Sequence, residues 1–198
     1  MAENTKIQKN EETHFPWNGD VLVGYESSHA QGVHGEGIQT TFIIQREFDL
    51  NPQWHIAPEL NVSIIVEDGS SLNKSAFYKS RDEISRTLSI GTSFAYDMVP
   101  KYFRLSAALD FGSSFQDASF IGVNLHNGFV DSVEPSRVAY TISPRVGALS
   151  KDLAHIGPLH LGLGVYWQTI YSIPTGQSKE KYFPNLNHSL LLGIHVGG

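Results

Sequence analysis

The sequence contains no cysteine, so disulfides, thiolate metal ligands and a cysteine nucleophile are excluded. Charged residues are scarce, because they make up only 17% of the 198 residues, where about a quarter is usual. Long apolar runs are missing too, and none approaches the roughly 20 residues of a transmembrane helix. The formal net charge is −6 and no basic run occurs, which argues against nucleic acid as a partner.

The N-terminal segment also lacks the apolar stretch of a signal peptide. Residues 2–13 are polar and rich in Lys, Glu and Asn, a composition that does not support a packed core. We therefore predict a flexible arm over residues 1–17 and a single domain over residues 18–198.

The clearest pattern runs from Trp54 to Glu67, where alternate positions read Trp, Ile, Pro, Leu, Val, Ile, Val and His, Ala, Glu, Asn, Ser, Ile, Glu. A period of two is typical of a strand with one apolar and one polar face. At about 3.3 Å per residue, this segment is long enough to cross the hydrocarbon of a bilayer even when it is tilted.

Seven further segments show the same alternation. We predict that all eight form an antiparallel up-and-down transmembrane β-barrel, with strands over residues 20–26, 38–48, 54–67, 86–96, 103–112, 137–147, 159–168 and 189–196. The connections between these segments alternate long and short. Barrels of the bacterial outer membrane show this asymmetry, with short periplasmic turns and longer outside loops.

Alternation alone does not decide which face points outward, because a soluble lipocalin-like barrel has the same pattern turned inside out. The positions of the lysines indicate here which face points outward. All eight of them, at positions 6, 9, 74, 79, 101, 151, 179 and 181, fall in the arm, the turns and the connections, whereas a water-facing strand surface normally carries lysine. We predict an apolar outer face in lipid, and the soluble ligand-binding barrel is the rival interpretation.

A few charged residues lie on the polar face, and a narrow lumen requires them to be paired. The predicted lumen charge network comprises Glu47, Glu59, Glu67, Arg104, Asp110, Arg137 and Arg145. The lumen face also carries His55, His160 and His195, which we expect to be hydrogen-bonded, with a pH-sensitive role left open. Since side chains just fill an eight-stranded barrel, we predict a largely plugged lumen, and a charged constriction for small solutes is the alternative.

Aromatic residues gather near the strand ends, where they predict the interfacial girdles of a membrane barrel: Phe48, Trp54, Tyr96, Phe103, Trp167 and Tyr171. Arg46 and Arg86 also lie on the apolar face near strand ends, where a long side chain can reach the headgroups. A second aromatic set falls in the long connections and predicts either contact with a surface partner or packing of the loops: Phe77, Tyr78, Phe120, Phe129, Tyr182 and Phe183.

The chain resembles the small eight-stranded outer-membrane barrels of the OmpA transmembrane-domain, Ail/Lom and opacity-protein type. Residues 46–54 (REFDLNPQW) are similar to their periplasmic turns, and residues 190–197 (LLLGIHVG) are similar to their closing strand. The resemblance implies a monomeric protein of the Gram-negative outer membrane that contacts lipid and lipopolysaccharide, with long loops for adhesion to a host or other surface partner. Pro58 and Pro144 depart from the pattern inside strands, where we expect bulges.

Lipid A deacylases of this barrel class place a His and a Ser two residues apart on the lipid face, and no His-x-Ser occurs here. His188 directly precedes Ser189, so the two fall on opposite faces of a strand. His29, His34 and Glu36 could bind a divalent metal, but we interpret them as exposed loop residues. We predict no enzyme, no cofactor and no metal site, with a narrow solute channel as the first alternative and a lipid-modifying hydrolase as the second.

Overall fold

The computed structural model describes residues 17–30, 33–70, 78–100, 102–123, 130–175 and 183–197. Eight long strands occupy most of these residues: β1 (Trp17–Ala30), β2 (Val33–Arg46), β4 (Trp54–Ser70), β5 (Tyr78–Val99), β6 (Phe103–Val123), β8 (Ser136–Ile156), β9 (Leu159–Pro174) and β10 (Leu186–Gly197). Two short strands, β3 (Phe48–Asp49) and β7 (Val130–Val133), pair with β4 and β6 at the two ends of the molecule. Among the described residues, no helix is long and apolar enough to span a membrane.

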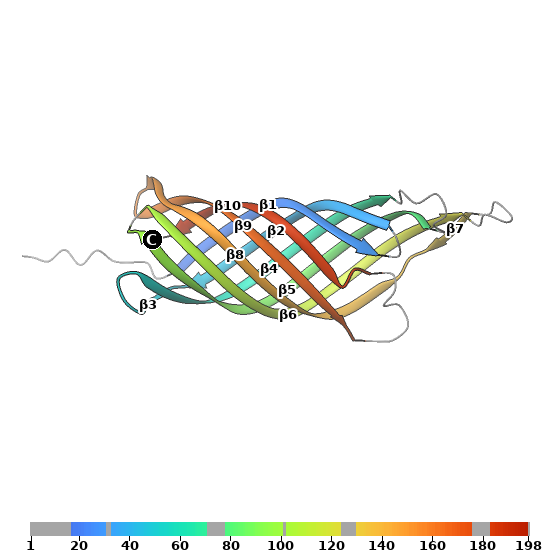
Figure 1. Cartoon of the computed structure of the whole chain (residues 1–198), viewed down its shortest axis with the longest axis horizontal. Coiled ribbons are helices and arrows are strands. Elements are labelled where there is room, and N and C mark those ends of the chain that lie inside the picture. Colours follow the sequence, from blue (N-terminus) through green and yellow to red (C-terminus); the bar gives the residue numbers. More distant parts are fainter. Residues whose placement is uncertain are drawn as a thin grey trace, which may run out of the picture.

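The eight long strands close into a barrel (Figure 1). They pair antiparallel in the order β2, β1, β10, β9, β8, β6, β5, β4, and pairing between β2 and β4 completes the ring. The predicted eight-stranded antiparallel barrel is therefore confirmed. The turns that follow β2, β5 and β8 lie at one end, the short-turn end, and we call the opposite end of the barrel the long-loop end.

The barrel wall is apolar on its outside and polar on its inside. Along β4, Leu60, Val62 and Val66 face outward and are exposed, while Glu59, Asn61 and Ser63 face inward and are buried. Mid-strand apolar side chains such as Ile90 and Leu192 are 67% and 64% exposed on the outer surface. A soluble lipocalin-like barrel needs the opposite arrangement, so that rival interpretation is wrong.

The strands are longer than predicted at the long-loop end. β5 starts at Tyr78 rather than at residue 86, and β6 continues to Val123 rather than to residue 112. The added segments contain Ser, Asp and Gly, which are typical of connections, yet they pair with each other in continuous register up to Ser80 and Ile121, with one register shift between Ser80 and Tyr78. The sequence also predicts a short turn over residues 150–155, between the strands 137–147 and 159–168. This prediction is wrong, because β8 continues to Ile156 and the chain reverses at Gly157 and Pro158.

Neither strand proline sits at a bulge, contrary to expectation. Pro58 pairs with Thr92 on β5 in unbroken register, and the β2–β4 ladder ends beside it at Glu59. At Pro144 the β8–β9 ladder pauses and resumes in the same register. Each proline thus interrupts one ladder, which accommodates its missing N–H without an extra residue.

The outer apolar surface has a defined edge at the long-loop end. On β4 and β5 it runs from Trp54 to Val66 and from Ile84 to Tyr96. Beyond it the outward-facing residues become acidic: Glu36, Asp68, Asp82 and Asp117. Arg86 lies at this edge and its Nη1 is 3.2 Å from Asp117 Oδ2, which fits the predicted reach toward the headgroups. The membrane-spanning segments end here.

Candidate functional site: the polar lumen

The lumen at the short-turn end is crossed by an arginine. Arg104 on β6 donates to Glu47 Oε2 and Oε1 at 2.5 and 2.9 Å, and its Nε donates to Asp97 at 2.6 Å. Lys151 donates to Asp97 at 2.9 Å, and His55 lies between Glu47 and Asp97 at 3.2 and 3.1 Å. Burial raises the pKa of Asp97, but hydrogen bonds and charge from Arg104 and Lys151 outweigh it and lower the pKa to about 2.

The middle of the lumen holds a second arginine-centred group. Arg145 on β8 donates to Glu59 on β4 at 2.6 Å and to Asp110 on β6 at 3.4 Å. Asn61 donates to Asp110 at 3.2 Å. The close approach requires a glycine on β5, because a Cβ at Gly91 would lie 2.0 Å from Asp110 Oδ1.

A neutral group spans the barrel beside this centre. Gln39 on β2 donates to Gln168 on β9 at 2.8 Å and to Thr41 at 2.9 Å. Gln168 in turn donates to Ser143 at 2.7 Å, and Ser189 donates to Gln39 at 2.5 Å. These bonds link β2, β8, β9 and β10 through side chains alone.

The long-loop end contains a buried acidic group with arginine. Arg81 on β5 donates to Glu67 at 2.8 Å and to Ser28 on β1 at 2.5 Å, and Ser28 donates to Glu67. Glu26 accepts from Asn187 at 2.7 Å. Burial and the adjacent Glu67 carboxylate raise the pKa of both Glu26 and Glu83.

An aromatic residue fills the remaining space near the centre. Tyr166 packs with Leu22, Ile43 and Leu191 in a buried apolar cluster. A Cβ at Gly147 on the neighbouring strand would lie 2.1 Å from the Tyr166 ring, so only glycine lets the ring lie flat against the wall.

The space left inside the lumen is small. A cavity of about 30 Å³ lies among Asp20, His55, Arg104, Arg145 and Tyr166. That volume holds about two water molecules. Cross-lumen side chains therefore leave little room for solute in this part of the barrel.

The structure places the seven residues of the predicted charge network inside the barrel, but they form separate groups along the lumen. Glu47 and Arg104 lie at one end, Glu59, Asp110 and Arg145 in the middle, and Glu67 near the other end. Arg137 instead donates to Gln116 at 2.5 Å and to the Pro184 carbonyl at 2.7 Å.

Sequence reasoning missed several members of these groups: Glu26, Arg81, Glu83, Asp97 and Lys151. Glu26 is the last residue of a predicted strand, Asp97 directly follows one, and the other three lie three to five residues outside one. Arg81 and Glu83 keep the same odd-numbered phase as the lumen-facing Ser85, Thr87 and Ser89. Continuing the period of two through the assumed connection could have identified both.

Two of the three predicted lumen histidines lie inside. His55 has the acidic neighbours described above, and His195 Nδ1 is 2.8 Å from Asp20 Oδ1. The prediction for His160 is wrong, since it lies at the short-turn rim with 48% of its side chain exposed. The strand β9 begins at Leu159, one residue before His160. His160 therefore has the alternation of an inward-facing residue but lies beyond the end of the lumen.

The predicted loop contacts need correction at two positions. Phe120 and Phe183 are buried, with exposed fractions of 0% and 3%, and pack together with Ala118. The Arg137 guanidinium lies 4.8 Å from the Phe183 ring centroid. The reason is that residue 120 belongs to β6, where alternation turns Phe120 inward and leaves its neighbour Ile121 45% exposed. Phe77, Phe129 and Tyr182 lie outside the described residues, as does the side chain of Tyr78.

The predicted girdle aromatics lie on the outer surface, and all of them except Trp167 lie near strand ends. At the short-turn end are Phe48, Trp54, Tyr96 and Phe103, and the Trp54 and Tyr96 rings are 4.8 Å apart. Arg46 joins them, 5.2 Å from the Phe48 ring centroid. On β9, Trp167 lies near the middle of the strand and Tyr171 lies near its long-loop end, and they are 49% and 46% exposed.

No family model matches the chain, and a comparison with curated proteins finds no match either. Similar solved structures include Ail, the attachment invasion locus protein of Yersinia pestis, at 14% identity over 90% of this chain and 97% of that one, with a TM-score of 0.40. Neisserial surface protein A gives 13% identity over 92% and 97%, with a TM-score of 0.46. The outer membrane enzyme PagL gives 12% identity over 91% and 99%, with a TM-score of 0.47. All three are eight-stranded outer-membrane barrels.

Proposed function

We propose that the protein is a closed, non-enzymatic barrel of the Gram-negative outer membrane whose long-loop end contacts a surface partner. The observation that carries the closed barrel is the set of side chains that cross the lumen at successive levels, from Arg104–Glu47 through Arg145–Glu59 to Arg81–Ser28. The second and third bonds join strands that are not neighbours in the barrel, and the first joins β6 to Glu47 in the connection between β2 and β3. A solute would have to break all of them to pass.

The shape of the long-loop end supports the contact role. β5 and β6 continue about six residues past the acidic edge of the outer surface, which at typical strand rise and tilt raises them by roughly 15 Å. The extension is held by backbone pairing and by the buried Phe120–Phe183 contact. On its outside, Ile121 and Val130 are 45% and 69% exposed. Exposed apolar side chains on a rigid support beyond the membrane suit binding of another macromolecule.

The closed lumen is tested by single-channel recording of the refolded protein in planar lipid bilayers. We expect no stable open steps. A matched variant with Arg104→Ala and Arg145→Ala should leak, because two of the crossing levels are then removed. Stable steps from the unaltered protein would overturn the closed barrel and favour the narrow-channel alternative.

The contact role is tested with lipid vesicles that carry the protein, applied to immobilised basement-membrane extract. Vesicles with the unaltered protein should be retained, and Ile121→Ser with Val130→Ser should reduce retention. The control is Leu153→Ser, which removes an exposed apolar residue at the short-turn end. Equal loss in the control would contradict the assignment to the long-loop end.

A lipid hydrolase is the second candidate, and one hydrogen bond favours it. Thr169 Oγ1 and His188 Nδ1 are 3.1 Å apart on facing strands, which is nucleophile-to-base distance. The His188 ring lies 5.8 Å from the outward-facing Trp167 ring, so the pair is on the lipid side. Ser189, in contrast, is buried in the lumen on Gln39. A change in lipopolysaccharide acylation after incubation with the protein, lost in Thr169→Val, would establish this candidate over the first.

A further inference from the structure

The hairpin between β8 and β9 brings two histidines face to face at the short-turn end. His155 and His160 are direct cross-strand partners, and directly opposed residues hold their Cβ atoms about 5 Å apart. Their ring centroids are 4.6 Å apart with an edge-on geometry. The turn between them is Gly157-Pro158, where Gly157 has a φ of 62° that suits glycine and proline restricts the next φ. The two imidazoles therefore sit on a short, stiff support.

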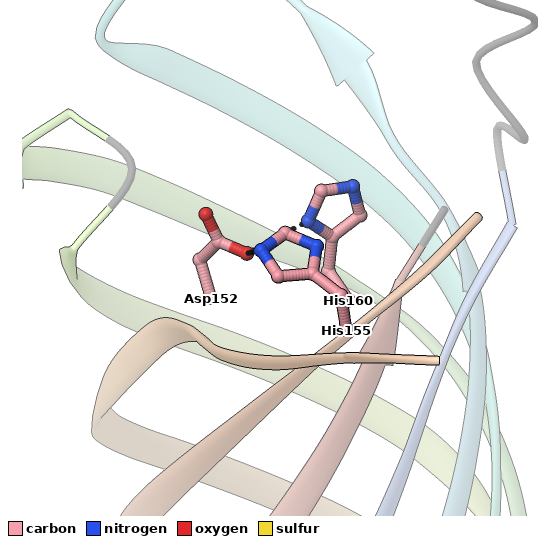
Figure 2. Close-up of side chains that lie close together, drawn as sticks. All are labelled: Asp152, His155 and His160. Atoms are coloured by element: carbon pink, nitrogen blue, oxygen red, sulfur yellow. Dashed lines mark hydrogen bonds and ion pairs between the residues drawn. The ribbon is translucent and has the colours of Figure 1, made fainter. Parts of the chain in front are cut away.

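A bulge supplies a carboxylate to this pair. The pairing of β8 with β9 shifts between Ser150 and Ala154, which leaves Asp152 outside the ladder. Asp152 has a φ of 61°, a left-handed conformation that few residues other than Gly, Asn and Asp adopt. Bulges commonly redirect a side chain, and here the carboxylate turns toward the two rings (Figure 2).

The three side chains converge on one point. Asp152 Oδ1 lies 2.8 Å from His155 Nε2 and 2.8 Å from His160 Nδ1. One ligand atom from each residue lies within 4.8 Å of the other two. We propose that Asp152, His155 and His160 form a site for a divalent transition metal such as Zn²⁺.

The donor set selects the class of ion. Two imidazole nitrogens and one carboxylate oxygen suit Zn²⁺, Cu²⁺ or Ni²⁺ rather than Mg²⁺ or Ca²⁺, which take oxygen ligands. Zn²⁺ bonds of about 2.0–2.2 Å in a tetrahedron need ligand atoms roughly 3.3 Å apart, so the carboxylate must move by about half an ångström. The side chains of His155 and His160 are 56% and 48% exposed, so the ion has access and three ligands leave a position for water.

A second group with metal-ligand spacing, Glu47, Asp49 and His55, differs in its electrostatics. Arg104 occupies both oxygens of Glu47, and His55 also contacts the Asp97 carboxylate that Lys151 binds. The positive charges of Arg104 and Lys151 beside this group oppose the binding of a metal cation. The Asp152 carboxylate instead faces two imidazoles, and the positive charge of a metal would replace the protons that these rings donate to it.

The test is calorimetric titration of ZnCl₂ into the folded full-length protein in detergent micelles, with cold gel mobility to verify folding. We expect one Zn²⁺ per chain, and His155→Ala with His160→Ala should weaken binding by roughly 100-fold or more. Asp152→Asn, which retains the left-handed backbone preference, should weaken it by about 10-fold or more. Co²⁺ should give the visible absorption of a tetrahedral site, and excess Mg²⁺ should not compete.

The matched control is the other cross-strand histidine pair, His29 and His34, at the opposite end. Their rings are 6.3 Å apart and only His34 contacts the carboxylate of Glu36, so His29→Ala with His34→Ala should leave Zn²⁺ affinity unchanged. Failure of the unaltered protein to bind Zn²⁺ would overturn the proposal. So would affinity that survives His155→Ala with His160→Ala, or that falls equally in the control. None of these outcomes depends on whether the lumen is closed.

Discussion

Replacing Arg145 by methionine should destabilise the barrel by about 3–4 kcal/mol, the lower part of the range for breaking a buried ion pair on one side. Methionine retains most of the chain length but removes the charge. Glu59 and Asp110 then remain inside the lumen with 0% of their side chains exposed. Asp110 keeps its bond from Asn61, whereas Glu59 loses the arginine that donates to it at 2.6 Å.

The size of the loss has an upper limit set by protonation. A stranded glutamate can take up a proton, and at pH 7 this costs about 3.7 kcal/mol from an ordinary pKa of about 4.3 at 1.36 kcal/mol per pH unit. The cost of Arg145→Met should therefore stay near this value and decrease as the pH falls toward 4. A neutral partner removes it, so Arg145→Met combined with Glu59→Gln should recover at least half of the lost stability.

The assay is urea unfolding in detergent micelles, followed by tryptophan fluorescence and by cold gel mobility. The control is Arg46→Met, which removes an exposed arginine from the outer rim and should cost under about 1 kcal/mol. If Arg145→Met unfolds at the same urea concentration as the unaltered protein, the central pair does not hold the barrel together. If the double variant is no better than the single one, the loss comes from packing rather than charge.

Three further predictions concern the outer face and the two ends. Ile90→Arg places a charge on the mid-strand outer surface and should lower the folding stability in lipid vesicles by about 2–4 kcal/mol. Ser89→Thr in the lumen should have little effect, and an equal loss in both variants would contradict the outward orientation of Ile90. The folded-state pKa of Asp97 is lowered to about 2, so its stabilising contribution is present above about pH 4 and lost between about pH 4 and 2; urea midpoints over this range should fall less steeply in Asp97→Asn. The pKa of Glu83 is raised in the folded state, so the stability of the barrel should fall as the pH rises above the ordinary pKa of glutamate. In Glu83→Gln the urea midpoint should therefore change less between pH 5 and 9.

The barrel itself could be predicted from the sequence because a period of two has only one structural meaning over a dozen residues. The absence of lysine from the predicted strands then indicated which face meets lipid, although Lys79 and Lys151 lie on the extended ends of β5 and β8 in the structure. Strand ends were harder to place. Arg81 and Glu83 lie in a segment rich in Ser, Asp and Lys, whose composition favours a connection although the backbone pairs with β6. A polar composition indicates that a segment is surrounded by water, and it does not separate a loop from a strand. The ends of β5 and β6 are strands that extend into water, so their composition is that of a connection.

The side-chain partners inside the lumen could not be predicted for a different reason. Which residues meet across the barrel depends on the stagger of the strands, and Arg145 reaches Glu59 on a strand 86 residues away in sequence. The metal-ligand cluster depends on the shift between Ser150 and Ala154. Without that bulge, alternation predicts that Asp152 and His155 point to opposite faces. The cluster therefore depends on a local irregularity of the β8–β9 pairing, which the alternation of the sequence does not predict.

The proposed closed lumen would confine binding to the two ends of the barrel, and these two ends differ in chemistry. The long-loop end presents an extended sheet with exposed apolar residues, and the short-turn end presents two histidines and a carboxylate on a tight hairpin. Variants in the lumen should therefore change unfolding without changing affinity at either end, while variants at the ends should do the reverse. Arg145→Met and His155→Ala are the sharpest pair for this comparison, because one side chain is 5% exposed and the other 56%. If Arg145→Met lowered Zn²⁺ affinity while the protein stayed folded, the lumen would be coupled to the turns and could not be treated as a passive plug.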